Sequence, residues 1–136
     1  MSIKLNHTIV FSRAKDAAAV FYTEILGLPR ATPFGPFLSI QTDNEVTLDF
    51  YDSDRPIVTQ HYAFLVGERE FDQIFSRIQK RGLPYWADPF HQRPDEINTD
   101  DGGRGLYFAD PSGHNLEIIT RQYGSGQATE VNKAAD

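Results

Sequence analysis

An internal repeat is the feature that most constrains how this chain of 136 residues can fold. Two amphipathic segments end in the same tripeptide, Gly-Leu-Pro, and the two copies lie 55 residues apart. Each copy follows a strand-like segment with one histidine, His7 or His61, and precedes a strand-like segment in which leucine is followed by a carboxylate, Asp49 or Glu117. Three matches in the same order predict two copies of a strand–helix–strand–strand–strand module.

The apolar pattern within each copy supports this prediction. Apolar, aromatic and β-branched residues predict strands at 3–11, 37–41 and 46–51 in the first copy and at 62–66, 106–109 and 115–120 in the second. A further short extended piece begins at Tyr85 and Trp86. Apolar residues at helical spacing predict one helix in each copy, with stripes formed by Ala17, Val20, Phe21 and Ile25 and by Phe71, Ile74, Phe75 and Ile78.

The two modules predict a single α+β domain over residues 1–123, with module one at about 1–54 and module two at about 55–123. Residues 124–136 are polar and without periodicity, which predicts a mobile tail. The second module is longer because of a polar segment at 88–104. A surface loop is the default expectation for this segment, and a lid that sets substrate identity is the alternative.

Composition narrows the classes of function. The chain has no cysteine, which excludes disulfides, zinc–thiolate sites and cysteine nucleophiles, so any metal must be held by His, Asp, Glu or water. Its formal net charge of −6, without a basic run, argues against nucleic acid as a partner. No stretch reaches the roughly 18 apolar residues of a membrane span, and the N-terminus lacks the apolar core of a signal peptide. We therefore expect a cytoplasmic protein without a nucleic-acid or membrane partner.

The repeat pairs four residues that suit a metal site. Asp49 and Glu117 each have the opposite parity to their apolar neighbours, so both carboxylates point away from the apolar face of a strand. Carboxylates are depleted in strands, and a half-buried one needs a cation, a set of hydrogen bonds or a metal. Together with His7 and His61 they form a donor set that divalent ions accept when thiolates are absent. For each residue taken alone, an exposed or merely hydrogen-bonded strand position is the alternative.

Four segments carry a resemblance to a known superfamily. They are the opening strand with His7, the helix segment Phe-Tyr-Thr-Glu-Ile-Leu-Gly-Leu at 21–28, His61, and the closing block Phe-Ala-Asp-Pro-Ser-Gly-His-Asn-Leu-Glu at 108–117. Over roughly residues 3–121 the chain resembles the vicinal oxygen chelate superfamily, which holds glyoxalase I, fosfomycin- and bleomycin-resistance proteins and extradiol dioxygenases. The resemblance implies paired βαβββ modules that form an open, U-shaped mixed sheet around a metal-site cleft. It also implies a homodimer, in which modules can be swapped between subunits.

The resemblance further implies which residues form the site. Superfamily members take metal ligands from the first, fourth, fifth and eighth strands, which here supply His7, Asp49, His61 and Glu117. Dioxygenases and fosfomycin-resistance enzymes use only two histidines and a glutamate, whereas glyoxalase I enzymes add a carboxylate from the fourth strand. Asp49 is one methylene shorter than the residue usual in glyoxalase I, a difference of about 1.5 Å. Direct ligation, a bound water and support of a ligand from behind all stay open for Asp49.

These implications predict a metal-dependent enzyme that acts on a small molecule with adjacent oxygens and uses Fe, Mn, Ni or Zn. A site with three protein ligands favours dioxygenase-like chemistry. A glyoxalase I-type lyase or isomerase, a fosfomycin-type thiol transferase and a metal-free protein that sequesters a drug or metabolite stay as alternatives. We expect Glu117 to be catalytic as well as a ligand, and Tyr107 to be either a proton donor or a packed aromatic. His114 is expected to be structural or exposed, and His91 to lie in the surface loop.

Overall fold

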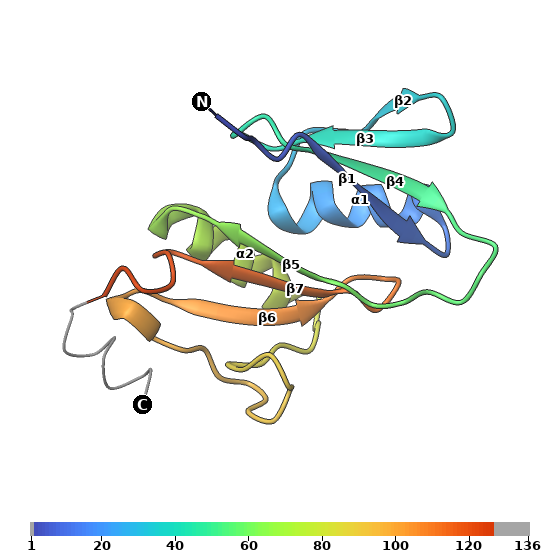
Figure 1. The fold of residues 1–136 in the computed structure, drawn as a ribbon. Helices are drawn as coiled ribbons and strands as arrows, with labels where there is room; N and C mark the ends of the chain where they lie inside the picture. Colours follow the sequence, from blue (N-terminus) through green and yellow to red (C-terminus); the bar gives the residue numbers. More distant parts are fainter. Residues whose placement is uncertain (1, 127–136) are drawn as a thin grey trace. The chain divides into compact units, whose positions relative to one another are not determined.

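The computed structural model describes residues 2–126, which form two compact units (Figure 1). Unit 1 comprises residues 2–59 together with Asp110–Gly113, and unit 2 comprises Gln60–Ala109 together with residues 114–126. Each unit combines one α-helix with an open mixed sheet, which confirms the α+β class. Most of the predicted tail lies outside the described residues. No helix within residues 2–126 is long and apolar enough to cross a membrane.

Unit 1 is a four-stranded sheet with one helix on one face. Its strands are β1 (His7–Ser12), β2 (Thr32–Phe34), β3 (Phe37–Gln41) and β4 (Thr47–Asp52), in the order β1-β4-β3-β2. β1 runs parallel to β4, and the other pairs are antiparallel. The helix α1 (Lys15–Leu26) packs against β1, β3 and β4. The strand residues buried in the core are Val10, Ile40, Leu48 and Phe50.

The buried face of α1 differs from the predicted stripe. Ala17 and Val20, which helical spacing places on the stripe, are exposed, whereas Tyr22 is fully buried. The Tyr22 ring packs edge-on against Phe50 with centroids 4.8 Å apart, and its hydroxyl donates a hydrogen bond to Asp110. The prediction for Ala17 and Val20 was wrong because α1 turns the side with Ala18, Ala19 and Tyr22 toward the core, where the Tyr22 ring is packed and its hydroxyl is hydrogen-bonded.

Unit 2 repeats this arrangement with one strand fewer. Its strands are β5 (His61–Leu65), β6 (Gly105–Ala109) and β7 (Asn115–Ile119), in the order β5-β7-β6. β5 runs parallel to β7, and β6 is antiparallel to β7. The helix α2 (Glu68–Lys80) buries Phe71, Ile74 and Ile78, which confirms three residues of its predicted stripe, while the fourth, Phe75, is half-buried. A short 3-10 helix, η1, covers Asp100–Gly102.

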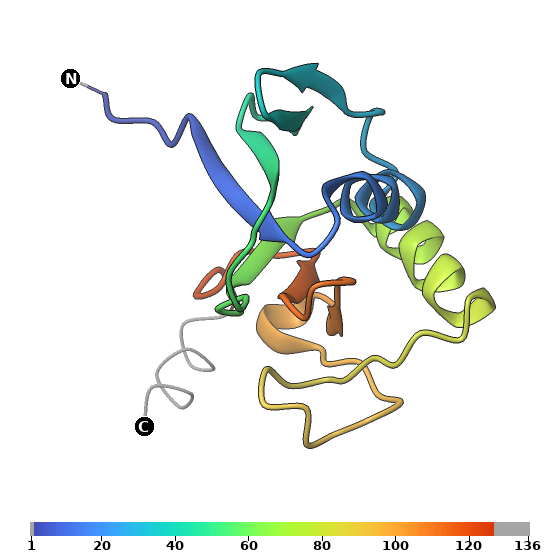
Figure 2. The same ribbon diagram turned by 90° about the vertical axis from the view of Figure 1, so that its right-hand side faces the viewer.

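The strand expected after α2 is reduced to one residue. Trp86 exchanges backbone hydrogen bonds of 2.9 and 2.8 Å with Tyr107 of β6, so it borders the sheet as β2 does in unit 1. The chain then turns away, and residues 88–104 run beside the β6 edge (Figures 1 and 2). The residues on either side of Trp86 bond to the loop: the Ala87 amide donates to the carbonyl of Arg93, and the Asp95 amide donates to the carbonyl of Tyr85, both at 3.0 Å. Because the second strand of module two is reduced to this bridge, β7 corresponds to the strand that the resemblance counts as the eighth.

The strand registers confirm the repeat. In unit 1 the β1 residue paired with Asp49 lies two positions after His7, and in unit 2 the β5 residue paired with Glu117 lies two positions after His61. Paired residues share a face of a sheet, and so do residues two apart on one strand. In each unit the histidine and the carboxylate therefore lie on the same face, opposite the helix.

The Asp-Pro-Ser-Gly turn between β6 and β7 packs in unit 1. Asp110 accepts hydrogen bonds from the Tyr22 hydroxyl at 2.8 Å and from the Ser112 amide at 2.9 Å. The Ser112 hydroxyl accepts one from the Arg13 amide at 3.1 Å. The motif that most resembles the superfamily thus contributes hydrogen bonds that hold the fold, next to the strand that carries Glu117.

Candidate metal centre

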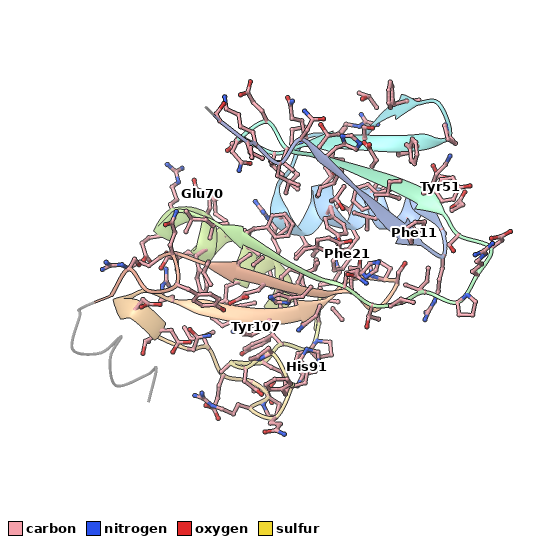
Figure 3. All side chains as sticks on the ribbon, in the orientation of Figure 1. Phe11, Phe21, Tyr51, Glu70, His91 and Tyr107 are labelled. Atoms are coloured by element: carbon pink, nitrogen blue, oxygen red, sulfur yellow. The ribbon has the colours of Figure 1, made fainter. Side chains whose placement is uncertain are left out.

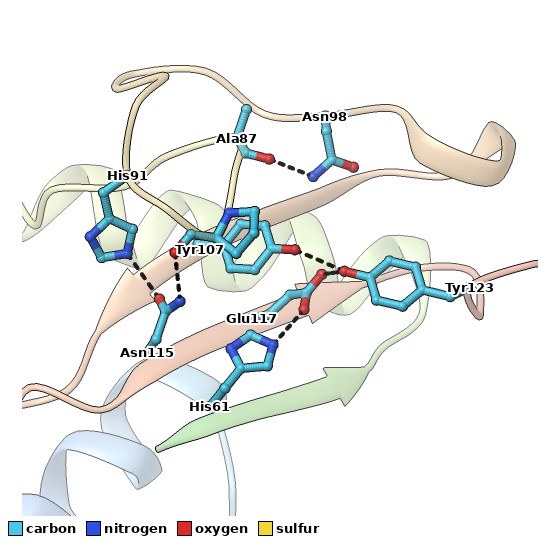
Figure 4. A network of polar contacts seen from close by, with 9 residues as sticks. His61, Ala87, His91, Asn98, Tyr107, Asn115, Glu117 and Tyr123 are labelled. Carbon is cyan, nitrogen blue, oxygen red and sulfur yellow. Dashed lines mark hydrogen bonds and ion pairs between the residues drawn. The ribbon is translucent and has the colours of Figure 1, made fainter. Parts of the chain in front are cut away.

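A histidine and a glutamate meet on the face of the unit 2 sheet that lies opposite α2. Glu117 lies in the middle of β7, and its side chain is fully buried. His61 is the first residue of β5, and 46% of its side chain is exposed. Its Nε2 atom lies 3.0 Å from Oε1 of Glu117 (Figure 4). The structure thus brings together two of the four predicted ligands, with one edge of the pair open to solvent.

The second carboxylate oxygen of Glu117 is held by a pair of tyrosines. The hydroxyl of Tyr123 contacts Oε2 of Glu117, and the hydroxyl of Tyr107 lies 2.8 Å from that of Tyr123 (Figure 4). An ionised carboxylate only accepts hydrogen bonds, so Tyr123 is the donor to Glu117, and Tyr107 in turn donates to Tyr123.

Both phenols stay protonated in this arrangement. Burial, reinforced by the hydrogen bonds with Tyr123 and Glu117, raises the pKa of Tyr107 well above its usual range. Burial and the hydrogen bond to Glu117 raise the pKa of Tyr123 to about 12. Such phenols are persistent hydrogen-bond donors and poor acids. The role of Tyr107, as a proton donor or a packed aromatic, stays a prediction.

The loop 88–104 reaches the same face of unit 2 through His91. The imidazole ring stacks on the Trp86 indole with centroids 3.7 Å apart. Its Nε2 lies 2.9 Å from Oδ1 of Asn115, as Figure 4 shows. The Asn115 amide also donates to the carbonyl of Pro89 at 3.2 Å. Because Asn115 pairs with His61 in the β5–β7 register, the loop is fixed beside the His61–Glu117 pair. Figure 3 shows His91 and Tyr107 with the surrounding side chains.

The other two predicted ligands lie in unit 1. His7 is exposed at the start of β1, with Nδ1 2.8 Å from Oδ1 of Asn6. Asp49 is buried, and its Oδ1 accepts a hydrogen bond from the Ser39 hydroxyl at 2.6 Å. Asp49 therefore bonds to a serine of the neighbouring strand, whereas Glu117 contacts an imidazole and a phenol. Phe11 and Tyr51 lie edge to face on the same side of this sheet, 6.1 Å apart between centroids (Figure 3).

Two polar residues near the pair, Tyr123 and Asn115, were not singled out from the sequence. Tyr123 stands at the start of the polar tail, and Asn115 is an ordinary strand residue by composition. His114 is fully buried, where its Nδ1 accepts the Gln60 amide at 2.9 Å, in keeping with a structural position. The signal available for Asn115 was its parity, which it shares with Glu117. Nothing in the local pattern marks Tyr123.

The His61–Glu117 pair offers donor atoms that suit a divalent ion, but too few of them to complete a site. An imidazole nitrogen and a carboxylate oxygen that face each other at an accessible edge are donors that Fe, Mn, Ni and Zn accept. Such ions take four to six ligands in proteins. Within residues 2–126 His, Asp and Glu form no group of three or more placed to hold a metal. His61 and Glu117 therefore provide two donors, and further ligands are needed to complete a site.

The chain thus combines two similar α+β modules with a histidine–glutamate pair on one face of the unit 2 sheet. Residues 4–118 match the profile of the Glyoxalase/Bleomycin resistance protein/Dioxygenase superfamily. This match spans most of the chain, and the protein belongs to that superfamily.

Individual relatives place the chain within the superfamily. It is 59% identical to oxidase ChaP-H1, with a TM-score of 0.89 over 90% of this chain and 99% of that one. It is 57% identical to oxidase ChaP-H2, with a TM-score of 0.91 over 93% of this chain and 100% of that one. Glutathione transferase FosA from Serratia marcescens is 29% identical over 84% of this chain and 78% of its own length.

Proposed function

We propose that this protein is a metal-dependent enzyme that acts on a small molecule with two adjacent oxygens. His61 and Glu117 are the proposed core ligands, and His7 is the third ligand that the resemblance implies. The observation that carries the proposal is the 3.0 Å contact between His61 Nε2 and Glu117 Oε1, made by two residues that the repeat and the motif select independently of the structure. Fe, Mn, Ni and Zn all suit these donors.

The roles of the chain's own residues follow from their contacts. Glu117 supplies negative charge from a fully buried position, and Tyr123 and Tyr107 hold its outer oxygen. His61 stands at the exposed edge, where a small molecule can enter. A bound divalent ion would supply positive charge to stabilise a chelating oxyanion and, in the case of iron, redox chemistry with O₂.

We propose oxygen-dependent oxidation as the reaction class. It is supported by the 59% identity to a protein named an oxidase and by a set of two histidines and one glutamate, which leaves coordination positions open. Thiol transfer is the second candidate, and the 29% identity to a glutathione transferase favours it. A glyoxalase I-type lyase and a metal-free binding protein are further outcomes of the same tests.

The metal is tested first and the reaction second. Protein purified without chelator is analysed for elements and then titrated with Fe(II), Mn(II), Ni(II) and Zn(II). The metal-loaded protein is next screened for substrate-dependent O₂ uptake and, separately, for loss of thiol from glutathione or cysteine. Absence of any metal binding would favour the sequestering protein. Thiol consumption without O₂ uptake would favour the transferase.

The homodimer is tested by sedimentation equilibrium. We propose that the protein sediments at twice the 15.4 kDa mass of one chain. A species of one chain mass at micromolar concentration would contradict the dimer.

The substitution Asp49→Ala is expected to weaken metal binding by about 10–100-fold, as the loss of a supporting residue does. The Asp49 carboxylate already has a hydrogen bond with Ser39 at 2.6 Å, and it is shorter than a glutamate by about 1.5 Å. Calorimetric titration with Mn(II) measures the effect, and Ser39→Ala serves as a control that leaves the carboxylate in place. A loss as large as that of Glu117→Gln would instead support the four-ligand glyoxalase I arrangement.

A further inference from the structure

The segment Arg121–Gly126, which we call the strap, is hydrogen-bonded to Asp101 of the loop 88–104. The two carboxylate oxygens of Asp101 accept hydrogen bonds from the backbone amides of Gly124, at 3.2 Å, and Gly126, at 3.1 Å. The Arg121 guanidinium donates to the carbonyl of Ser125 at 2.7 Å, which closes the strap on itself. The strap is therefore an ordered structure with its own anchors.

The fit between strap and loop is close. A Cβ atom added at Gly126 would lie 2.8 Å from Cα of Asp101, a distance that real Cβ atoms essentially never show. Asp101 itself has a positive φ of 56°, a conformation that aspartate and asparagine tolerate better than most residues. The first observation places the backbone of the strap at Gly126 directly against Asp101.

The strap carries Tyr123, whose side chain reaches the Glu117 carboxylate of the candidate metal centre. The phenol spans from the strap to the Glu117 carboxylate, where its hydroxyl contacts Oε2, while Oε1 faces His61 (Figure 4). A carboxylate rotates freely about its last bond unless both oxygens are held. With Tyr123 on one oxygen, the other is directed to the imidazole edge.

We propose that Tyr123 is a positioning residue for metal ligation by Glu117, and that the Asp101 anchor of the strap holds it in place. In this arrangement Tyr123 fixes Oε2 so that Oε1 is presented to the metal beside His61. This inference rests on the proposed metal site. Through Asp101 and Tyr123, the loop 88–104 is thereby linked to the orientation of the Glu117 carboxylate.

Two substitutions test the Tyr123 hydroxyl and the Asp101 anchor separately. Tyr123→Phe removes the hydroxyl and keeps the ring. Asp101→Asn keeps the tolerance for positive φ, but it replaces one accepting oxygen with an NH₂ group; because each oxygen takes a different amide, either orientation of the asparagine loses one anchor. Asp100→Asn makes the same charge change one residue away and is the matched control.

The readouts are Mn(II) affinity by calorimetry, the absorption spectrum of the Co(II)-loaded protein, and hydrogen exchange of residues 121–126 without metal. We expect Tyr123→Phe to weaken Mn(II) binding by about tenfold or more and to alter the Co(II) spectrum. The lost hydrogen bond to the buried Glu117 carboxylate is expected to lower the melting temperature by only about 4 °C. Asp101→Asn is expected to shift affinity in the same direction and to speed exchange in the strap. Asp100→Asn is expected to match the parent protein in all three readouts.

The outcomes distinguish this inference from the proposed function. If the parent protein binds metal and Tyr123→Phe binds it equally well or more tightly, the positioning role is overturned and the metal site stands. If Tyr123→Phe weakens binding but Asp101→Asn changes neither affinity nor exchange, the role of the anchor is overturned. If the parent protein binds neither Mn(II) nor Co(II), the metal site and the positioning role fail together.

Discussion

Replacement of Glu117 by glutamine is expected to abolish stoichiometric binding of divalent metal. The side chain is fully buried and keeps its shape in the variant, so the fold is retained while the negative charge is lost. Loss of a residue that merely supports a ligand weakens binding by about 10–100-fold, so loss of the ligand itself is expected to exceed about 100-fold, or roughly 2.7 kcal/mol. Calorimetric titration with Mn(II) and elemental analysis of the purified variant measure this.

The matched control is Glu96→Gln, which makes the same change at an exposed carboxylate that pairs with Arg93. His61→Ala and His7→Ala are expected to match Glu117→Gln if both imidazoles ligate the ion. Retention of stoichiometric metal by Glu117→Gln would contradict the proposed centre. If His7→Ala keeps stoichiometric metal while the other two variants lose it, the site consists of His61, Glu117 and ligands other than His7.

Local rules predict the repeat and most of the elements. Helix α1 ends at Gly27, whose φ of 76° lies in the left-handed region, as a glycine followed by Leu-Pro predicts. The strand registers then place each histidine and carboxylate on one face, because parity is conserved when parallel strands pair. These features follow from periodicity and chirality and need no knowledge of distant contacts.

Features set by contacts between distant residues could not be predicted. Val20 is exposed because Tyr22 occupies the core-facing side of α1, where it bonds to Asp110, 88 positions later in the chain. Trp86 forms a bridge in place of a strand, and its neighbours Tyr85 and Ala87 bond to Asp95 and Arg93 of the loop.

The same limit applies to the site. Pairing of His61 with Glu117 was predictable, since both positions come from the repeat and their strands are neighbours. Tyr123 was not, because its contact with Glu117 depends on the anchor at Asp101, and the intervening sequence has no periodicity that reports it. His7 and Asp49 stay predictions as ligands.

The substitution Asp110→Ala is expected to lower the free energy of unfolding by about 3 kcal/mol. It removes the buried acceptor of the Tyr22 hydroxyl and of the Ser112 amide, and an unsatisfied buried donor costs about 1–3 kcal/mol. For a chain of this length the melting temperature is expected to fall by about 10 °C. Urea denaturation followed by circular dichroism measures the change in midpoint.

Tyr22→Phe keeps the ring against Phe50 and removes only one of these donors, so a loss of about 1–1.5 kcal/mol in the free energy of unfolding is expected. Because the two residues share a hydrogen bond, the double variant should be less destabilised than the sum of the single variants. Additive effects would contradict the coupling of Tyr22 and Asp110. An Asp110→Ala loss within about 0.5 kcal/mol of the parent protein would show that the Asp-Pro-Ser-Gly turn does not hold the fold.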